Sequence, residues 1–194
     1  MKKTIIFDFD GTIADTLGSV VRIVTCMQTI LDTKKLQKKT SIPAGKKPRE
    51  ILSFLGLSIF KLPSWTRKIH SEMNKEISHL EPTVNILPIL SELYEKDHVQ
   101  MGILTSNTQE NVKKFLFKNR LEFFDFIHTG KSVFGKIHVI NKILKQQNVD
   151  QRYTFYVCDE IRDIEAAKKS GIMSIAVTWG YNTKEACKKN VRIF

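Results

Sequence analysis

Two aspartates, Asp8 and Asp10, stand one residue apart at the end of the apolar run Ile5-Ile6-Phe7. A buried strand has no physical reason to end on two carboxylates unless a cation lies there, because unpaired charge beside a hydrophobic core is costly. We therefore interpret this segment as part of an active site.

Two further apolar segments of the chain also end in polar side chains. Thr105-Ser106-Asn107 follows residues 101–104, and Asp159, Glu160 and Asp163 follow residues 156–158. Ligands of parallel sheets bind beyond the carboxyl ends of the strands, so we expect these clusters to meet at one edge of a sheet. Carboxylates from different strands suit a hard cation such as Mg²⁺, which prefers oxygen ligands and would offset their mutual repulsion.

The segments that must position these groups alternate between strand and helix patterns. Strands are predicted at residues 3–9, 99–104, 126–129, 154–158 and 173–177, and helices at residues 86–96, 107–120, 136–147, 161–170 and 183–189. This alternation predicts an α/β fold, a Rossmann-like parallel sheet wrapped by helices.

A segment of about 65 residues that follows the first strand shows helical patterns and no clear strand. Helices are predicted within residues 17–31, 48–55 and 62–80, with a loop at 34–48 that is rich in lysine, glycine and proline. We therefore predict an α/β core domain of residues 1–15 and 83–194, with a small helical cap domain, residues 16–82, inserted after the first strand.

The composition narrows the classes of partner. The chain has 194 residues and a formal net charge of +11, and residues 16–82 hold twelve basic and five acidic side chains. Such a basic lobe can steer anions towards a cleft, but lysines also serve simply as solvated surface, and no known nucleic-acid-binding motif accompanies the charge. The apolar residues before Asp8 are too few for a signal peptide or a transmembrane helix, so we expect a cytoplasmic protein.

Four polar segments follow one another along the chain: Asp8-Phe9-Asp10-Gly11-Thr12, Leu104-Thr105-Ser106-Asn107, Gly135-Lys136 and Cys158-Asp159-Glu160-Ile161-Arg162-Asp163. Their types and order resemble the motifs of the haloacid dehalogenase superfamily. Over about residues 4 to 182 the chain resembles the phosphatase branch of that superfamily with a helical cap, and it is similar to phosphoglycolate phosphatases. Asp10 favours phosphoryl transfer, because resemblance to a true dehalogenase would lack an acid at this position.

The resemblance implies four catalytic roles. Asp8 would attack phosphorus to give an aspartyl-phosphate, and Asp10 would protonate the leaving oxygen and then deprotonate the water that cleaves the intermediate. Thr105 would donate its hydroxyl to the phosphoryl group, and Lys136 would supply a positive charge to the nucleophile and the phosphate.

The resemblance also implies a magnesium site and substrate contacts. Mg²⁺ would bind the Asp8 carboxylate, the Asp10 backbone carbonyl and Asp159, while Asp163 would support the site from outside by orienting water or Lys136. The expected substrate-binding residues are Gly11, Thr12, Ser106, Asn107 and, on the cap, Arg49, for which a surface arginine is a competing interpretation. Ser106 or Asn107 is also expected to cap the helix that follows.

Two positions depart from the family pattern. Cys158 stands before Asp159 where the phosphatases usually have glycine, and Ile137 stands where a proline commonly follows the lysine. Neither change removes a catalytic group. The thiol of Cys158 could alter the local backbone or make the site sensitive to oxidation.

These observations predict a magnesium-dependent phosphatase that acts on a small phosphorylated metabolite. Phosphoglycolate is the best single candidate for the substrate, with sugar phosphates, nucleotides and pyrophosphate left open. A phosphomutase of the same superfamily and a non-catalytic protein that binds nucleic acid or a regulatory partner are the alternatives. We expect a monomer or a homodimer, without membrane association and without nucleic acid as a partner.

Overall fold

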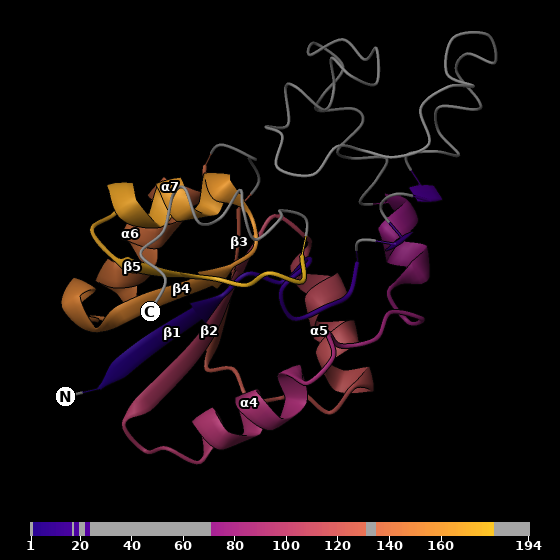
Figure 1. Cartoon of the computed structure of the whole chain (residues 1–194), viewed down its shortest axis with the longest axis horizontal. Coiled ribbons are helices and arrows are strands. Elements are labelled where there is room, and N and C mark those ends of the chain that lie inside the picture. Colours follow the sequence, from indigo (N-terminus) through magenta and orange to yellow (C-terminus); the bar gives the residue numbers. More distant parts are fainter. Residues whose placement is uncertain (1, 17, 20–21, 24–70, 131–134, 181–194) are drawn as a thin grey trace, which may run out of the picture.

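A five-stranded parallel sheet forms the centre of the molecule in the computed structural model, which describes residues 2–16, 18–19, 22–23, 71–130 and 135–180. The strands are β1 (Lys3–Phe7), β2 (Val99–Thr105), β3 (Phe126–Thr129), β4 (Thr154–Cys158) and β5 (Met173–Ala176). They lie in the order β3-β2-β1-β4-β5, so β1 is central and pairs with β2 on one side and β4 on the other (Figure 1).

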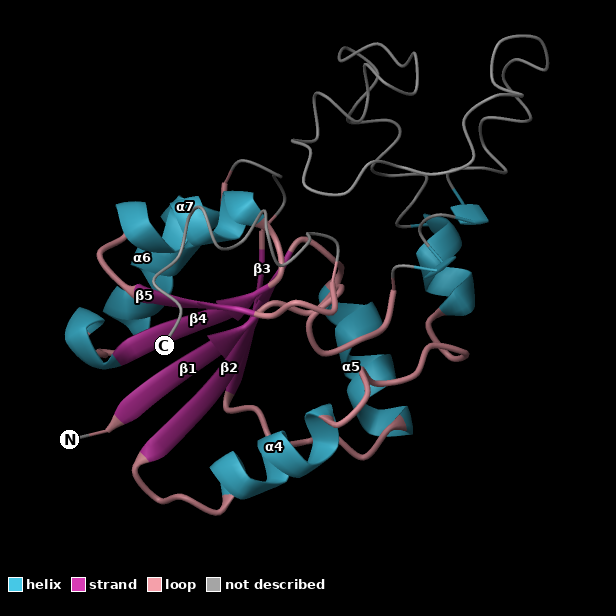
Figure 2. Cartoon of the chain, in the orientation of Figure 1, coloured by secondary structure: helices cyan, strands magenta, loops and turns pink. Residues whose placement is uncertain are grey.

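Helices cover both faces of this sheet. They are α4 (Ile86–Tyr94), α5 (Gln109–Lys118), α6 (Lys136–Gln146) and α7 (Ile161–Lys169), and a short 3-10 helix, η2 (Gln151–Tyr153), precedes β4. Figure 2 shows α4 and α5 on one side of the strands and α6 and α7 on the other. The predicted α/β class, a Rossmann-like parallel sheet wrapped by helices, is confirmed.

The alternation of side chains along each strand explains the two layers. Phe7, Ile103 and Val157 pack in one hydrophobic cluster with the buried residues of α4 and α5. Their sequence neighbours Ile6 and Tyr156 pack in a second cluster with the buried residues of α6 and α7. Because successive side chains of a strand point to opposite faces, a parallel sheet with helices on both sides needs apolar residues at nearly every position.

The ends of three strands and the start of one helix differ from the sequence-based prediction by one or two residues. The first strand ends at Phe7 rather than at residue 9, because the Phe9 carbonyl turns to accept hydrogen bonds from the backbone N–H groups of residues 12, 13 and 14. The expectation that Ser106 or Asn107 caps the following helix was wrong, since Thr108 is the N-cap of α5 and its Oγ1 accepts from the Asn111 N–H at 3.3 Å.

The predicted cap falls mostly outside the described residues. Residues 18–19, 22–23 and 71–76 are helical, and the Arg22 guanidinium contacts the Glu76 carboxylate at 2.7 Å. Residues 24–70, which include Arg49, and the helix predicted at 183–189 are not described, so the division into core and cap stays a prediction. Among the described helices, none has the length and apolar character needed to cross a bilayer.

Candidate active site

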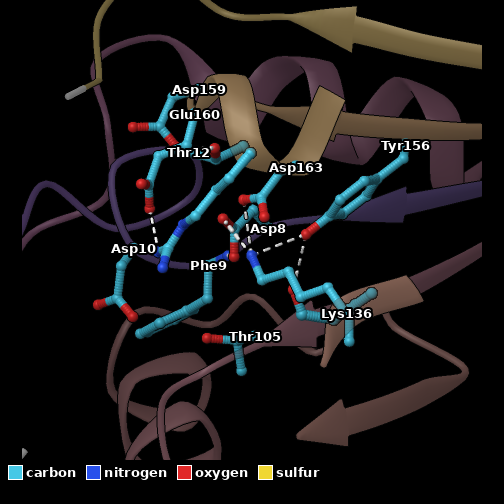
Figure 3. A network of polar contacts seen from close by, with 12 residues as sticks. Asp8, Phe9, Asp10, Thr12, Thr105, Lys136, Tyr156, Asp159, Glu160 and Asp163 are labelled. Atoms are coloured by element: carbon cyan, nitrogen blue, oxygen red, sulfur yellow. Dashed lines mark hydrogen bonds and ion pairs between the residues drawn. The ribbon is translucent and has the colours of Figure 1, made fainter. Parts of the chain in front are cut away.

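The ends of three neighbouring strands and the first residue of α6 bring the predicted catalytic residues together. Asp8 follows β1, Thr105 ends β2, Asp159 follows β4 and Lys136 begins α6 (Figure 3). Each of these residues is at most 3% exposed. Because the strands are parallel and adjacent, residues far apart in sequence meet at one edge of the sheet, as predicted.

Asp8 is held by contacts to both of its carboxylate oxygens. Its backbone N–H donates to the Val157 carbonyl at 2.8 Å, which continues the β1–β4 ladder by one residue. Asp8 Oδ1 accepts from the Phe9 N–H at 2.8 Å, and Oδ2 accepts from Lys136 Nζ at 2.8 Å. The carboxylate is therefore oriented by the backbone on one side and by an ammonium group on the other.

The Lys136 ammonium bridges two carboxylates. Besides Asp8, Lys136 Nζ donates to Asp163 Oδ2 at 2.7 Å and to the Tyr156 hydroxyl at 2.9 Å. Burial lowers the pKa of Lys136, but the charges of Asp163 and Asp8 raise it by more, so it lies above its ordinary value. Lys136 is thus charged at physiological pH. Its contact with Asp163 matches the outer support expected for that residue.

Asn107 contacts the predicted acid–base residue. Its Nδ2 donates to both carboxylate oxygens of Asp10, at 3.2 and 3.3 Å. Asn107 Oδ1 accepts from the Thr108 N–H and from Asn111 Nδ2, both at 2.8 Å, which fixes the amide with its NH₂ group towards Asp10. The structure thus places Asn107 as a partner of Asp10, and its predicted contact with substrate stays a prediction. Asn111 was missed by the sequence analysis.

Asp10 has a pKa suited to proton transfer. Burial raises the pKa of Asp10 to about 6, although the hydrogen bond from Asn107 and the charge of Lys136 lower it. A carboxyl group that donates a proton in one step and accepts one in the next works best with a pKa near the operating pH. This pKa supports the acid–base role predicted from the sequence.

Asp159 lies between the first loop and the segment after β5. The Thr12 hydroxyl donates to Asp159 Oδ1 at 3.3 Å, and the Trp179 indole N–H donates to the Thr12 carbonyl at 3.3 Å. A Cβ added at Gly180 would lie 2.2 Å from Asp159 Oδ2, so only glycine lets the chain pass this carboxylate. Thr12, predicted to bind substrate, therefore contacts Asp159 in this structure.

The remaining predicted substrate contacts have local explanations. Gly11 has a φ of 76°, a conformation that favours glycine, and it lies in the turn that follows Asp10. Thr105 Oγ1 accepts from the Asn107 N–H at 3.0 Å, so its own hydrogen can donate to another group. Ser106 is half-buried beside Thr105.

Three carboxylates are arranged so that they could hold a metal ion. Asp8, Glu160 and Asp163 each offer an oxygen atom, and these atoms lie within 4.8 Å of one another. Asp163 Oδ1 is buried and has no hydrogen-bond partner among the described residues. Oxygen donors of this kind suit Mg²⁺, so the residues present fit the predicted cation.

This cluster differs from the predicted set of metal ligands. The predicted ligands are Asp8, Asp10 and Asp159, whereas Glu160 and Asp163 accompany Asp8 in the observed cluster. Asp159 is close enough to Asp8 that its charge contributes to the raised pKa of Asp8. The position of Glu160 directly after Asp159 in the sequence could have pointed to it. Glu160 lies in the turn before α7, and the guanidinium of Arg162 contacts its carboxylate.

The two acids that flank Lys136 differ in pKa. Burial raises the pKa of Asp8 well above its ordinary value despite the charge of Lys136. Burial also raises the pKa of Asp163, but the charges of Lys136 and then Arg162 lower it by more, so it falls below its ordinary value. Asp8 is therefore the carboxylate whose charge most needs further compensation from a cation.

Comparisons with known proteins agree with this geometry. A family model described as haloacid dehalogenase-like hydrolase matches residues 5–177. The chain is 26% identical to the phosphoglycolate phosphatase of Synechococcus elongatus, over 95% of this chain and 87% of that protein. It is also 26% identical to the phosphoglycolate phosphatase of Photorhabdus laumondii subsp. laumondii, over 95% and 83%. The solved structure of a haloacid dehalogenase-like family hydrolase from Streptococcus pneumoniae has a TM-score of 0.71 at 19% identity, covering 97% of this chain and 90% of that one.

The chain therefore belongs to the haloacid dehalogenase-like hydrolase family. Its curated relatives are phosphatases, and the enzyme class predicted from the sequence is confirmed at this level.

Proposed function

We propose that this protein is a magnesium-dependent phosphatase that hydrolyses a small phosphomonoester through an aspartyl-phosphate on Asp8. This proposal depends on the position of the Asp8 carboxylate. It lies directly after β1 and accepts hydrogen bonds from the Phe9 N–H and the Lys136 ammonium, both at 2.8 Å. The second acid, Asp10, follows two residues later with a pKa of about 6.

In the first half of the proposed reaction, a carboxylate oxygen of Asp8 forms a bond to phosphorus while the bond from phosphorus to the leaving oxygen breaks. Asp10 gives its proton to that oxygen, so the product leaves as an alcohol. The Thr105 hydroxyl, helped by backbone N–H groups around Phe9 and Ser106, would donate to the phosphoryl oxygens.

In the second half, Asp10 takes a proton from a water molecule, whose oxygen attacks the phosphorus of the aspartyl-phosphate. The bond between Asp8 and phosphorus breaks, which regenerates the carboxylate and releases inorganic phosphate. Asp8, the Asp10 backbone carbonyl and Asp159 would hold Mg²⁺, with the carboxylates of Glu160 and Asp163 close to Asp8. When bound, the ion would offset the negative charge of the carboxylates and of the phosphoryl group.

The substrate class follows from the family and from the charge of the chain. We propose phosphoglycolate as the best single candidate, supported by relatives of that name at 26% identity. The excess of basic residues in the proposed cap, residues 16–82, would attract such an anion, and closure of the cap would exclude water. We propose Arg49 as a substrate-selecting residue on that cap, and a cytoplasmic monomer or homodimer as the working form.

The test is phosphate release from a panel of small phosphomonoesters, with and without Mg²⁺, by the wild-type protein and Asp8→Asn. We expect turnover that requires Mg²⁺ and is lost in the variant, with phosphoglycolate among the best substrates. Isomerisation without phosphate release would identify a phosphomutase instead. Absence of turnover together with salt-sensitive binding of RNA or DNA would support a binding protein.

A further inference from the structure

We infer that Tyr156 is a positioning residue for the proposed reaction, because its hydroxyl holds the Lys136 ammonium between Asp8 and Asp163 and so keeps the Asp8 carboxylate oriented for attack. None of the sequence motifs points to this tyrosine. The inference rests on the proposed function and adds Tyr156 to the residues that serve the reaction.

The contacts of the Tyr156 hydroxyl determine its role. Tyr156 lies in β4, and its side chain is fully buried on the face of the sheet covered by α6 and α7. Its oxygen accepts from Lys136 Nζ at 2.9 Å and lies 3.3 Å from the Leu104 carbonyl. A charged ammonium can only donate, so the single hydrogen of the hydroxyl must be given to Leu104.

All three hydrogens of the Lys136 ammonium have acceptors in this arrangement. Asp8 and Asp163 each accept one of them, and Tyr156 accepts the third. The ammonium therefore acts on the two carboxylates as a fixed charge. Without the tyrosine hydroxyl, one buried N–H would lack an acceptor, and the ammonium would turn towards another acceptor, such as an oxygen of the bound phosphate ester.

The same hydroxyl ties together the elements that surround Asp8. Leu104 precedes Thr105 in β2, Tyr156 is in β4, and β1 lies between these two strands. The hydrogen bond from Tyr156 therefore joins the two strands on either side of β1, close to the residue that follows β1, Asp8.

The first test compares Tyr156→Phe with Tyr153→Phe, which removes the hydroxyl of a tyrosine outside the site, in η2. We expect Tyr156→Phe to lower kcat about tenfold while KM changes by less than about twofold, because substrate still binds but Asp8 is less well oriented. Tyr153→Phe should match the wild type in both parameters. A folded Tyr156→Phe protein with wild-type kcat would overturn the inference, since a purely structural role would change only the folded fraction.

A second test does not depend on activity. Because all three of its hydrogens have acceptors, the Lys136 ammonium in ¹⁵N-labelled protein should give a slowly exchanging ¹H–¹⁵N signal. The signal is assigned by its loss in Lys136→Arg. We expect this signal to broaden or disappear in Tyr156→Phe and to persist in Tyr153→Phe. An unchanged signal in Tyr156→Phe would overturn the inference. If the signal changes as expected but the wild type releases no phosphate, the positioning contact stands and the proposed function fails.

Discussion

The Lys136 ammonium lies 2.8 Å from the carboxylate of Asp8, although 128 residues separate the two in the chain. The contact joins the first residue of α6 to the residue that follows β1, and both side chains are almost completely buried. Breaking a buried ion pair of this kind strongly destabilises the folded protein, because removal of one partner leaves an uncompensated charge.

Lys136→Met is therefore expected to lower the free energy of unfolding by about 3–5 kcal/mol near neutral pH, since both Asp8 and Asp163 lose their shared cation. Urea unfolding measures this. Lys114→Met is the matched control, because Lys114 pairs with Glu110 on an exposed helix face, where solvent screens the pair, and its loss should change the stability very little. Equal stability losses in the two variants would contradict the buried bridge.

Asp10→Asn is expected to stabilise the metal-free protein near pH 8 while lowering turnover about 10²-fold or more. Because folding raises the pKa of Asp10 from 3.8 to about 6, the folded state binds the proton more tightly than the unfolded state. The stability that this provides is complete below pH 3.8 and is lost as the pH rises through 6, where the charged carboxylate is buried. The expected gain near pH 8 is about 1–2 kcal/mol, reduced because Asp10 keeps some contact with solvent.

Thermal or urea unfolding at several pH values measures the effect of Asp10→Asn. The difference from wild type should shrink towards zero as the pH falls to about 4, where the wild-type carboxyl is protonated in the folded state. A variant that is less stable than wild type near pH 8 would show that the Asn107 contact outweighs the cost of burial.

Gly180→Ala is expected to weaken Mg²⁺ binding by about tenfold or more, because the added Cβ would lie 2.2 Å from Asp159 Oδ2 and must displace that carboxylate. Calorimetric titration with Mg²⁺ measures the affinity. Gly18→Ala serves as the control, since among the described residues no atom beyond its chain neighbours and its own helix backbone lies within 4 Å of a Cβ at that position. If Gly180→Ala binds Mg²⁺ as tightly as wild type, Asp159 is not required for the metal.

Mg²⁺ is expected to raise the melting temperature of the wild-type protein, because it would offset the repulsion among Asp8, Glu160 and Asp163. Glu160→Gln should reduce this increase, and chelation of the metal should abolish both the increase and turnover. Comparison of Glu160→Gln with Asp159→Asn then decides between the observed acidic cluster and the predicted ligand set. The variant with the smaller response to Mg²⁺ has lost the more important ligand.

Much of the fold could be predicted because local patterns determine it. The strands at 126–129 and 154–158 have the predicted bounds, since each is a short apolar run next to polar turn residues. Three of the four helices α4 to α7 begin at the predicted residue, and only α5 begins later than predicted. Thr108 rather than Asn107 is the N-cap of α5, because the Asn107 side chain donates to Asp10, which follows β1. Such a contact depends on packing between distant segments of the chain.

The alternating strands and helices, the parallel sheet and the convergence of its polar residues could be predicted from the order of residues along the chain, because parallel strands bring their carboxyl ends to one edge. The converging residues are Asp8, Asp10, Thr105, Lys136 and Asp159. Which of these groups contact one another depends on the packing of the folded chain. The contacts of Lys136 with Tyr156, of Asn107 with Asp10 and of Thr12 with Asp159 join residues 20 to 147 positions apart. Spacing in the chain cannot reveal such pairs, because they depend on how side chains from separate strands and helices pack in three dimensions.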